Sequence, residues 1–436
     1  MTIENVSEDQ FREIIRRHFT PGRAISSTEY LRGREAKLRQ IDRAFNSEGK
    51  HIFVHGDRGV GKTSLARTAA FIHSSSERAP ATIECEKHVT AYQLLRDIAV
   101  KCVPAADFAN QTNTKKTVKA GFPLLSGEMV EEVRRGQIPE LKSINDALTV
   151  IGYLASINAK KPVIVIDEFD VIADDVTRHT FASFIKHVSD QEVGIRFIVC
   201  GIGDSLDEMI GAHQSTGRYL MPIPLERLPH DARWEIISSA ASEMGVVIDD
   251  NSLIRTGQVS DGFPYYVHLI GEKLFWALSD DDAPVKQSSP DHFEVALREA
   301  STEAEPSLKN AYERATQKYT NDYQQVLWAV ADDSSMRRQV KDIYDSYKRL
   351  MDRHYRDKEV MDLTKFYNRM NALKTERHGS IIRTTGAGWF EFRENRLRGY
   401  VRLVAQRQGV DLEPEHHLGA RLHTPFLDYR ANEEGR

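Results

Sequence analysis

Short apolar runs alternate with amphipathic stretches along the first half of the chain. Runs that stay apolar without a polar alternation are typical of strands covered on both faces, and we predict them at His51–His55, Ala81–Glu84, Pro162–Ile166, Ile195–Cys200 and Tyr219–Leu225. Apolar residues spaced by three and four predict helices around Phe11–His18, Leu31–Phe45, Lys62–Ile72, Tyr92–Val103, Ile144–Ala159, Asp175–Val188 and Ser205–His213. This alternation predicts an α/β fold with a doubly wound parallel sheet.

The second half of the chain has helical spacing almost throughout. Four helices are predicted after Leu228, at Asp231–Glu243, Asn251–Val259, Tyr265–Leu278 and His292–Ser301. Three more, at Asp322–Ala331, Met336–Tyr355 and Thr364–Glu376, precede a hairpin over Ser380–Phe392 that turns at Gly386–Gly388. We therefore predict five segments: an N-terminal segment 1–50, a core 51–228, a helical lid 229–304, a third domain 305–409 and a tail 410–436. Residues 107–143 lack a sustained period and are interpreted as an insertion or a loop.

Composition narrows the class of protein. The chain has 436 residues, of which 40% are hydrophobic and 28% charged, as expected of a globular protein with two or three domains. No apolar run is long enough to span a bilayer, so we expect no membrane partner. The three cysteines, Cys85, Cys102 and Cys200, have no metal-ligand spacing, and a reducing cytoplasm fits them.

One glycine-rich segment carries the clearest chemistry. It fits the pattern G-x-x-x-x-G-K-[ST] and runs through Gly56, Asp57, Arg58, Gly59, Val60, Gly61, Lys62 and Thr63 to Ser64. Glycines let the backbone curl with its N–H groups facing inward, and those donors and the following helix N-terminus attract phosphate. Lys62 would reach the β- and γ-phosphates, and the Thr63 hydroxyl would ligate Mg²⁺. Because the segment lies between a predicted strand and a predicted helix, we interpret it as a P-loop for ATP rather than a plain turn.

Two acids follow a predicted central strand. Asp167 and Glu168 come directly after Pro162–Ile166. In P-loop enzymes an Asp at this place completes the Mg²⁺ site with the loop Thr. Asp167 is the candidate for that role, and Glu168 is the candidate to orient or deprotonate the attacking water. Taken alone, the pair could equally cap the next helix.

Over roughly residues 20–405 the chain resembles the AAA+ ATPases, above all their origin-recognition-complex-like branch of bacterial and archaeal type. The resemblance rests on Leu31–Glu35, similar to a G-R-E box, on the P-loop, and on Val163–Asp170. It implies that Arg34 lies on the adenine side. It also implies a γ-phosphate sensor at Asp204 or Ser205, and an arginine, Arg218, that reaches the ATP of a neighbouring subunit in a homo-oligomer. Arg218 could instead form an ordinary surface ion pair.

The lid departs from that family pattern. A sensor arginine is expected after a glycine, but this chain has Gly262, Phe263 and Pro264 followed by two tyrosines. This form is similar to STAND signalling ATPases and to transposon-regulator ATPases. The resemblance places Pro264 near the nucleotide and predicts slow hydrolysis.

The C-terminal region is basic. From Met336 to Gly409 there are 18 Lys and Arg against 9 Asp and Glu, a local charge of +9, whereas the whole chain carries −5. It resembles the winged helix of origin-recognition proteins. Leu363, Phe366, Met370 and Leu373 form one apolar stripe, and we expect the double-stranded DNA contacts to come from Lys365, Arg369, Arg377 and, on the wing, Arg383. Further basic surface is expected from Arg393, Arg396, Arg398 and Arg402.

Two functions remain open at this point. The first is an ATP-hydrolysing, DNA-binding oligomer of origin-recognition type. The second is a STAND-like switch whose ATP state controls assembly with an effector protein, the third domain then docking protein rather than DNA. The basic region favours the first, and the lid without its arginine favours the second.

Overall fold

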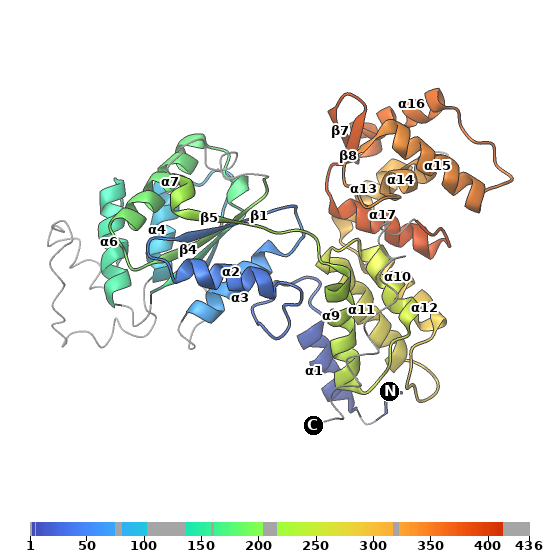
Figure 1. The fold of residues 1–436 in the computed structure, drawn as a ribbon, viewed down its shortest axis with the longest axis horizontal. Coiled ribbons are helices and arrows are strands. Elements are labelled where there is room, and N and C mark those ends of the chain that lie inside the picture. Colours follow the sequence, from blue (N-terminus) through green and yellow to red (C-terminus); the bar gives the residue numbers. More distant parts are fainter. Residues whose placement is uncertain are drawn as a thin grey trace. The chain divides into compact units, whose positions relative to one another are not determined.

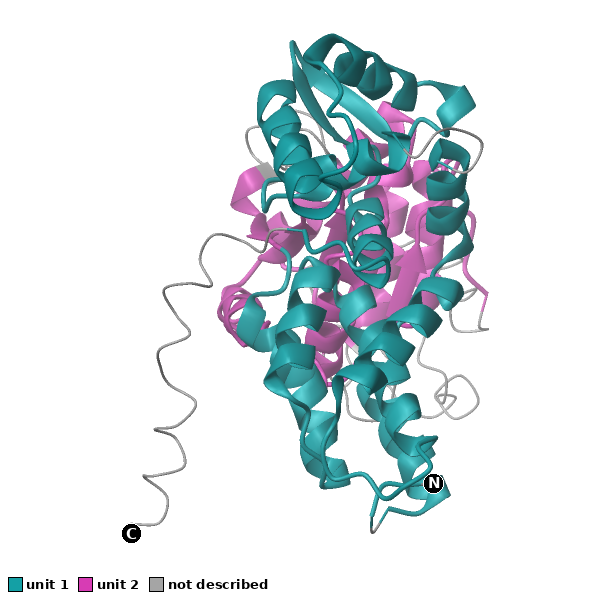
Figure 2. Cartoon of the chain, turned by 90° about the vertical axis from the view of Figure 1, so that its right-hand side faces the viewer, with its two compact units in different colours: residues 1–21, 227–436 teal, residues 22–226 magenta. Residues whose placement is uncertain are grey.

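The computed structural model describes residues 2–4, 6–74, 81–102, 137–157, 161–203, 216–316 and 322–412. They form two compact units, residues 22–226 and residues 1–21 with 227–436 (Figure 2). The predicted helix Ser205–His213 and most of the predicted 107–143 insertion and of the tail lie outside the described residues. The division into five segments stays a prediction. Within the described residues, no helix is long and apolar enough to cross a membrane.

The unit of residues 22–226 is built on a parallel sheet of five strands. These are β1 (His51–His55), β2 (Ala81–Glu84), β3 (Val163–Asp167), β4 (Arg196–Gly201) and β5 (Leu220–Pro224), in the order β2-β3-β4-β1-β5 (Figure 1). In the centre, Val54 of β1 lies opposite Cys200 of β4 and Ile223 of β5. All five predicted strands are confirmed to within one residue at each end.

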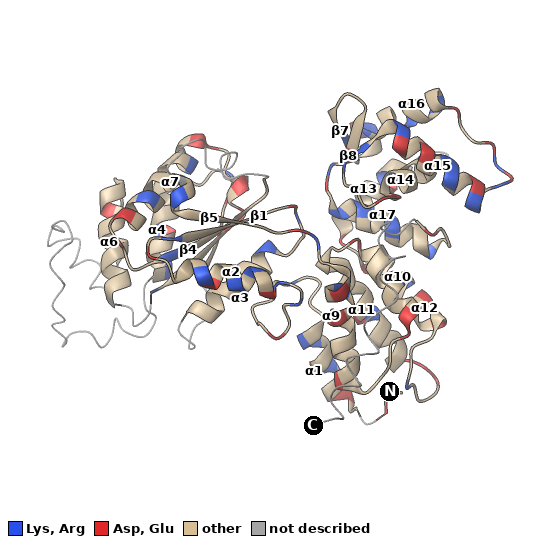
Figure 3. Cartoon of the chain, viewed as in Figure 1, with Lys and Arg blue, Asp and Glu red and all other residues tan. Residues whose placement is uncertain are grey.

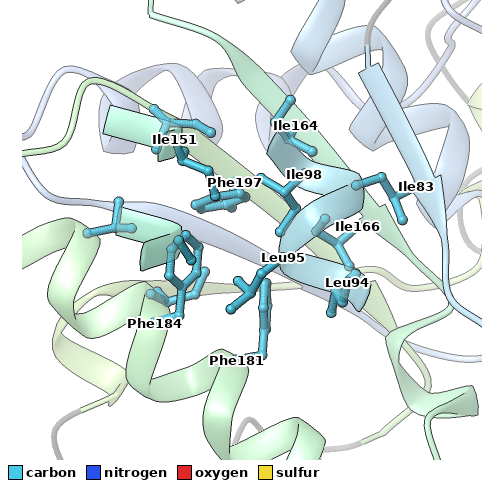
Figure 4. Close-up of a cluster of buried hydrophobic side chains, with 14 of the residues drawn as sticks. Ile83, Leu94, Leu95, Ile98, Ile151, Ile164, Ile166, Phe181, Phe184 and Phe197 are labelled. Atoms are coloured by element: carbon cyan, nitrogen blue, oxygen red, sulfur yellow. The ribbon is translucent and has the colours of Figure 1, made fainter. Parts of the chain in front are cut away.

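Helices cover both faces of this sheet. On one face α4 (Ala91–Cys102), α6 (Ile144–Ile157) and α7 (Asp175–Asp190) pack on one another, and on the other face α2 (Glu35–Phe45) and α3 (Lys62–His73) pack against the strands (Figure 1). The first face holds a buried apolar cluster that includes Leu94, Leu95, Ile151, Phe181, Phe184 and Phe197 (Figure 4). Burying each such side chain contributes about 1.5–3 kcal/mol, which fixes the sheet. The predicted doubly wound α/β fold is confirmed.

The other unit begins with the first 21 residues. Its helix α1 (Glu8–His18) packs on α9 (His230–Met244) and α11 (Pro264–Ser279). The ring of Phe19 covers Gly271 of α11 so closely that a Cβ there would come within 2.4 Å of it. Two more helices, α10 (Asp250–Ser260) and α12 (Pro290–Glu303), complete the four predicted after Leu228.

The same unit continues into a group of helices with a small sheet. The elements are α13 (Pro306–Thr316), α14 (Asp322–Ala331), β6 (Arg338–Gln339), α15 (Val340–His354), α16 (Leu363–Leu373), the 3₁₀ turn η4 (Glu376–His378), β7 (Ile382–Gly386), β8 (Trp389–Phe392) and α17 (Arg396–Arg407). The strands pair antiparallel in the order β6-β8-β7, so the predicted hairpin is confirmed. The helix predicted over Met336–Tyr355 is wrong in its first residues, because Arg338 and Gln339 pair with β8 instead. Sequence spacing missed α13 and α17.

Two expectations about side chains in this region are wrong. Leu363 is not part of the buried stripe, since it is the first residue of α16 and is 49% exposed, whereas Phe366, Met370 and Leu373 are buried. Arg398 and Arg402 do not extend a basic surface, because α17 is a buried helix and turns both guanidinium groups inward.

One of those inward arginines, Arg398, reaches the carboxylate of Asp261, whereas Arg402 donates to the backbone carbonyls of Gln258 and Ala331. Asp261 is 3% exposed and accepts a hydrogen bond from Arg227 Nη1 at 2.6 Å, while Arg398 Nε lies 3.1 Å from its other oxygen. Burial lowers the pKa of Arg398 to about 10, and the charge of Asp261 opposes that shift. In the first turn of α11, Tyr266 donates to the carbonyl of Arg396 at 2.8 Å, and its ring leaves no room for a Cβ at Gly399. The turn before α11 is therefore tied directly to α17.

Replacing Asp261 with Ala should destabilise the protein strongly. The change leaves Arg398 buried without its counter-charge, and breaking a buried ion pair in this way typically costs about 3–5 kcal/mol. We expect a lower midpoint in urea denaturation followed by circular dichroism. Asp345→Ala, which removes the half-exposed partner of Lys348, is the matched control and should leave the midpoint nearly unchanged. Equal midpoints for both variants would contradict the role given to Asp261.

Candidate functional site

The loop between β1 and α3 has the backbone that its sequence predicts. Gly56, Gly59 and Gly61 have φ values of 145°, 85° and 99°, which L side chains rarely adopt. A Cβ on Gly56 would also lie 2.2 Å from the carbonyl oxygen of Leu225. Gly61 caps α3 and has no side chain that could accept from the first-turn N–H groups. These backbone donors suit an anion such as phosphate.

Lys62 opens α3, and its ammonium group lies within the loop. Nζ donates to the carbonyl of Gly56 at 2.9 Å and to that of Asp57 at 2.7 Å. Burial lowers the pKa of Lys62, while nearby acidic groups, including Asp170 and Asp167, oppose the shift. Phosphate oxygens are stronger acceptors than neutral carbonyls, so the same ammonium is well placed to bind them.

The other residues of the loop differ in what they face. Val60 is buried, Arg58 is exposed, and Asp57 is half-buried. Thr63 is half-buried in the first turn of α3, beside Lys62. The Ser64 hydroxyl accepts from the backbone N–H of Ile25 at 3.1 Å, so it anchors the chain that leads to α2.

Arg34, expected on the adenine side, is buried, and its guanidinium group forms hydrogen bonds with backbone carbonyls. Its Nη2 donates to the carbonyl of Val60 at 2.9 Å and to that of Glu226 at 2.7 Å. Burial lowers the Arg34 pKa to about 10, so the group stays cationic at neutral pH. One guanidinium therefore joins the start of α2, the P-loop and the end of this unit.

The two acids lie at the same edge of the sheet as the P-loop. Asp167 is the last residue of β3, is buried, and accepts from the backbone N–H of Glu168 at 3.0 Å. Glu168 is exposed and has φ 53° and ψ 38°, a left-handed conformation that costs a residue other than glycine about 1 kcal/mol or more. This strained turn sends successive carboxylates in different directions, as their two proposed roles require.

Two residues that the sequence analysis did not single out contact the chain just after β4. Asp170 Oδ1 accepts from the N–H of Ile202 at 2.9 Å, and His55 Nδ1 lies 3.1 Å from the carbonyl oxygen of Gly203. The acidic run after β3 gave a signal for Asp170, whereas nothing in the sequence gave one for His55. The sensor candidates Asp204 and Ser205 lie outside the described residues.

Arg218 lies at the opposite edge of the sheet. It ends the 3₁₀ turn η3 (Thr216–Arg218) that leads into β5, and its carbonyl accepts from Lys50, the residue before β1. Because β1 and β5 are parallel, that edge is separated from the P-loop by the length of β1, about 16 Å for five residues. The exposed Arg218 therefore lies on the side of the sheet opposite the phosphate loop of its own chain.

The remaining candidates belong to the other unit. Pro264 is the first residue of α11. Lys365 and Arg377 are exposed, among the many Lys and Arg of α15, α16 and the segment after it (Figure 3). Arg369 instead lies over the ring of Tyr323 and 3.3 Å from Asp322, and Arg383 pairs with Glu391 at 2.6 Å.

Comparison with known proteins agrees with this geometry. Residues 30–199 match the family described as AAA ATPase domain. A Walker-type ATPase of Pyrococcus abyssi is structurally similar, with a TM-score of 0.53 and 16% identity over 87% of this chain and 99% of that one. The Orc1 protein of Aeropyrum pernix, solved in complex with DNA, gives a TM-score of 0.41 at 15% identity over 87% and 95% of the two chains. Cdc6p of Pyrobaculum aerophilum gives 0.42 at 14% identity over 91% and 98%. No curated protein matches the chain.

The family match supports ATP binding and ATPase activity in general for residues 30–199. Together with the parallel sheet, the phosphate loop and the first structural likeness, it gives the chain an α/β P-loop core of the AAA+ type.

Proposed function

We propose that this protein binds ATP in the loop of residues 56–64 and hydrolyses it with the help of Glu168. The observation that carries the proposal is the shared edge of the sheet, where the glycine loop, Lys62, Asp167 and Glu168 all emerge. The loop N–H groups and Lys62 would hold the phosphates, and Glu168 would orient the water that attacks the terminal phosphorus. In this proposal the protein works in the cytoplasm, where its three buried cysteines stay reduced.

A divalent cation fits the same edge. The Thr63 hydroxyl and the Asp167 carboxylate are oxygen ligands of the kind that Mg²⁺ prefers. Thr63 follows Lys62 in α3, and the negative charge of Asp167 favours the charged form of Lys62 against the effect of burial. When bound, Mg²⁺ would neutralise charge on the phosphates. Arg34 would act indirectly here, through the shape that it gives the loop. Pro264, the first residue of α11, stays a candidate for nucleotide binding.

Glu168→Gln should keep ATP binding and lose turnover. The amide preserves the shape of the side chain and leaves Asp167 in place, but it cannot accept a proton from water. Lys62→Ala is the contrasting variant and should lose tight ATP binding, because the phosphates lose their cation. A fluorescent ATP analogue measures binding, and phosphate release measures turnover. Wild-type turnover in Glu168→Gln, or unchanged ATP affinity in Lys62→Ala, would count against the proposal.

We further propose that Arg218 completes the site of a neighbouring copy. Its place at the opposite edge of its own sheet supports a head-to-tail contact, in which unlike surfaces of two copies meet. An arginine supplied in trans to a transferring phosphoryl group typically raises the rate by about 10³–10⁵.

Mixing two inactive variants tests that contact. Arg218→Ala has an intact phosphate loop and Lys62→Ala has an intact arginine, so some mixed interfaces should hold one complete site. We expect each variant alone to be inactive and the mixture to recover part of the phosphate release, with specific activity rising with protein concentration. An active wild type whose specific activity is independent of concentration, together with no recovery in the mixture, would refute the contact in trans.

The C-terminal elements are proposed to bind double-stranded DNA as a winged helix. Support comes from the antiparallel sheet beside α16, the local charge of +9, and the exposure of Lys365 and Arg377. Arg369 and Arg383 remain candidates, although both are paired with carboxylates. One observation favours the alternative, in which the partner is an effector protein. Leu363 and Tyr367 of α16 are 49% and 41% exposed, and large side chains of this kind are suited to contact with a partner protein in an interface.

DNA binding should weaken when a phosphate-contacting cation is removed. Lys365→Ala and Arg377→Ala should each lower the affinity for duplex DNA. Each should also reduce the slope of log affinity against log salt concentration by about one unit. Arg12→Ala, an exposed cation on α1, is the control and should change neither. Fluorescence anisotropy over a salt series, with and without ATP and Mg²⁺, measures both quantities. If the wild type does not bind duplex DNA at low salt, the effector-protein function takes its place.

A further inference from the structure

The exit of β4 lies between the two halves of the candidate site. In the sheet β4 is flanked by β1, which leads into the P-loop, and by β3, which ends in Asp167. His55, the last residue of β1, is opposite Gly201, the last residue of β4. The chain that leaves β4 at Ile202 and Gly203 therefore starts between the phosphate loop and the acids.

A side chain at the end of β1 and one in the 3₁₀ turn after β3 (Phe169–Val171) hold this short chain. From the β3 side, Asp170 Oδ1 accepts from the backbone N–H of Ile202 at 2.9 Å. From the β1 side, His55 Nδ1 lies 3.1 Å from the carbonyl oxygen of Gly203. A carbonyl can only accept, so Nδ1 must carry the proton of this hydrogen bond, which fixes the tautomer of a neutral His55 ring. That ring stacks on Phe53 with centroids 5.3 Å apart and an interplanar angle of 8°, which also fixes its plane.

The two hydrogen bonds are complementary. Asp170 binds the backbone N–H at the start of the two-residue segment Ile202–Gly203, and His55 binds the carbonyl at its end, so the segment is held at both ends. Gly203 has φ 155°, and its backbone would otherwise be among the freest in the chain. Both clamping residues are neighbours of the proposed catalytic machinery in sequence: His55 precedes Gly56, and Asp170 follows Glu168 by two.

We propose that His55 and Asp170 are positioning residues for ATP hydrolysis, which hold the chain after β4 in register with the P-loop and with Asp167 and Glu168. The inference rests on the proposed ATPase function. It assigns neither residue a contact with the reacting atoms, since both act through the backbone of Ile202 and Gly203. A misplacement of about 1 Å in a reacting site can cost about 10²-fold in rate, so such clamps matter for turnover more than for binding.

Asp170 offers a matched pair of substitutions. Asp170→Asn keeps an oxygen that can accept from Ile202 N–H but removes the charge, whereas Asp170→Ala removes both. We expect Asp170→Asn to keep kcat within about threefold of wild type and Asp170→Ala to lose about 10–100-fold, with ATP affinity little changed in either. If Asp170→Asn falls as far as Asp170→Ala, the charge is what matters and the clamp is refuted.

Two substitutions of His55 distinguish its two ring nitrogens, because each nitrogen can be mimicked separately by a side-chain amide. The amide of Asn reaches the place of Nδ1, and the longer amide of Gln reaches the place of Nε2. We expect His55→Asn to retain turnover and His55→Gln to lose it by about 10–100-fold. The opposite order would show that Nε2 acts in the site, and wild-type turnover in His55→Gln would show that the clamp is unnecessary. Either result overturns the proposal for His55.

The same assays separate this inference from the function on which it rests. Each variant is measured for binding of the fluorescent ATP analogue, for phosphate release, and for its melting temperature, beside wild type, Lys62→Ala and Glu168→Gln. A wild type that does not hydrolyse ATP refutes the proposed function itself. A wild type that hydrolyses ATP, with both pairs of variants unaffected, refutes only the positioning role. Since Asn and Gln at position 55 differ by one methylene, a difference between them at equal melting temperatures reports position and not folding.

Discussion

Parallel pairing of β1, β3 and β4 brings their carboxyl ends to one edge of the sheet, and every core residue proposed to meet the phosphates of ATP starts from that edge. The register is fixed by side-chain packing, because a slip of one residue moves every side chain of a strand to the opposite face of the sheet, where the covering helices differ. Gly56 then has to turn beside the end of β5, where the carbonyl of Leu225 leaves no room for a Cβ. The shape of the phosphate loop thus follows from the sheet beneath it as well as from its own glycines.

In each of the two units a buried arginine connects segments that are distant in the sequence. Arg34 joins the P-loop to the end of residues 22–226 through two carbonyls, and Arg398 joins α17 to Asp261 in the other unit. A buried guanidinium requires several acceptors at fixed places, so each of these residues specifies how its neighbouring backbone segments meet. The lid turn that begins α11 is bound to α17 by Asp261 and Tyr266.

The sequence predicts the sheet and the phosphate loop well because both depend on local signals. Apolar runs mark strands such as Pro162–Ile166, and glycine and lysine spacing marks residues 56–63. It fails where tertiary packing overrides local character. The four arginines of α17 look like a solvated face, but two are buried against carboxylate and carbonyl acceptors in distant segments. The backbone contacts of Arg34, His55 and Asp170 could not be predicted either, even where the sequence marked the residue, since each binds backbone far away in the chain.

The central claim is that the loop of residues 56–64 takes the β- and γ-phosphates of ATP. Isothermal titration of the wild-type protein with ATP, ADP and AMP, each with Mg²⁺, tests it most directly. AMP lacks the β- and γ-phosphates that Lys62 would bind and offers the loop N–H groups its α-phosphate alone, so the account predicts tight binding of ATP and ADP and a far weaker heat signal with AMP. Equal affinity for AMP and ATP, or no binding of ATP, would contradict it.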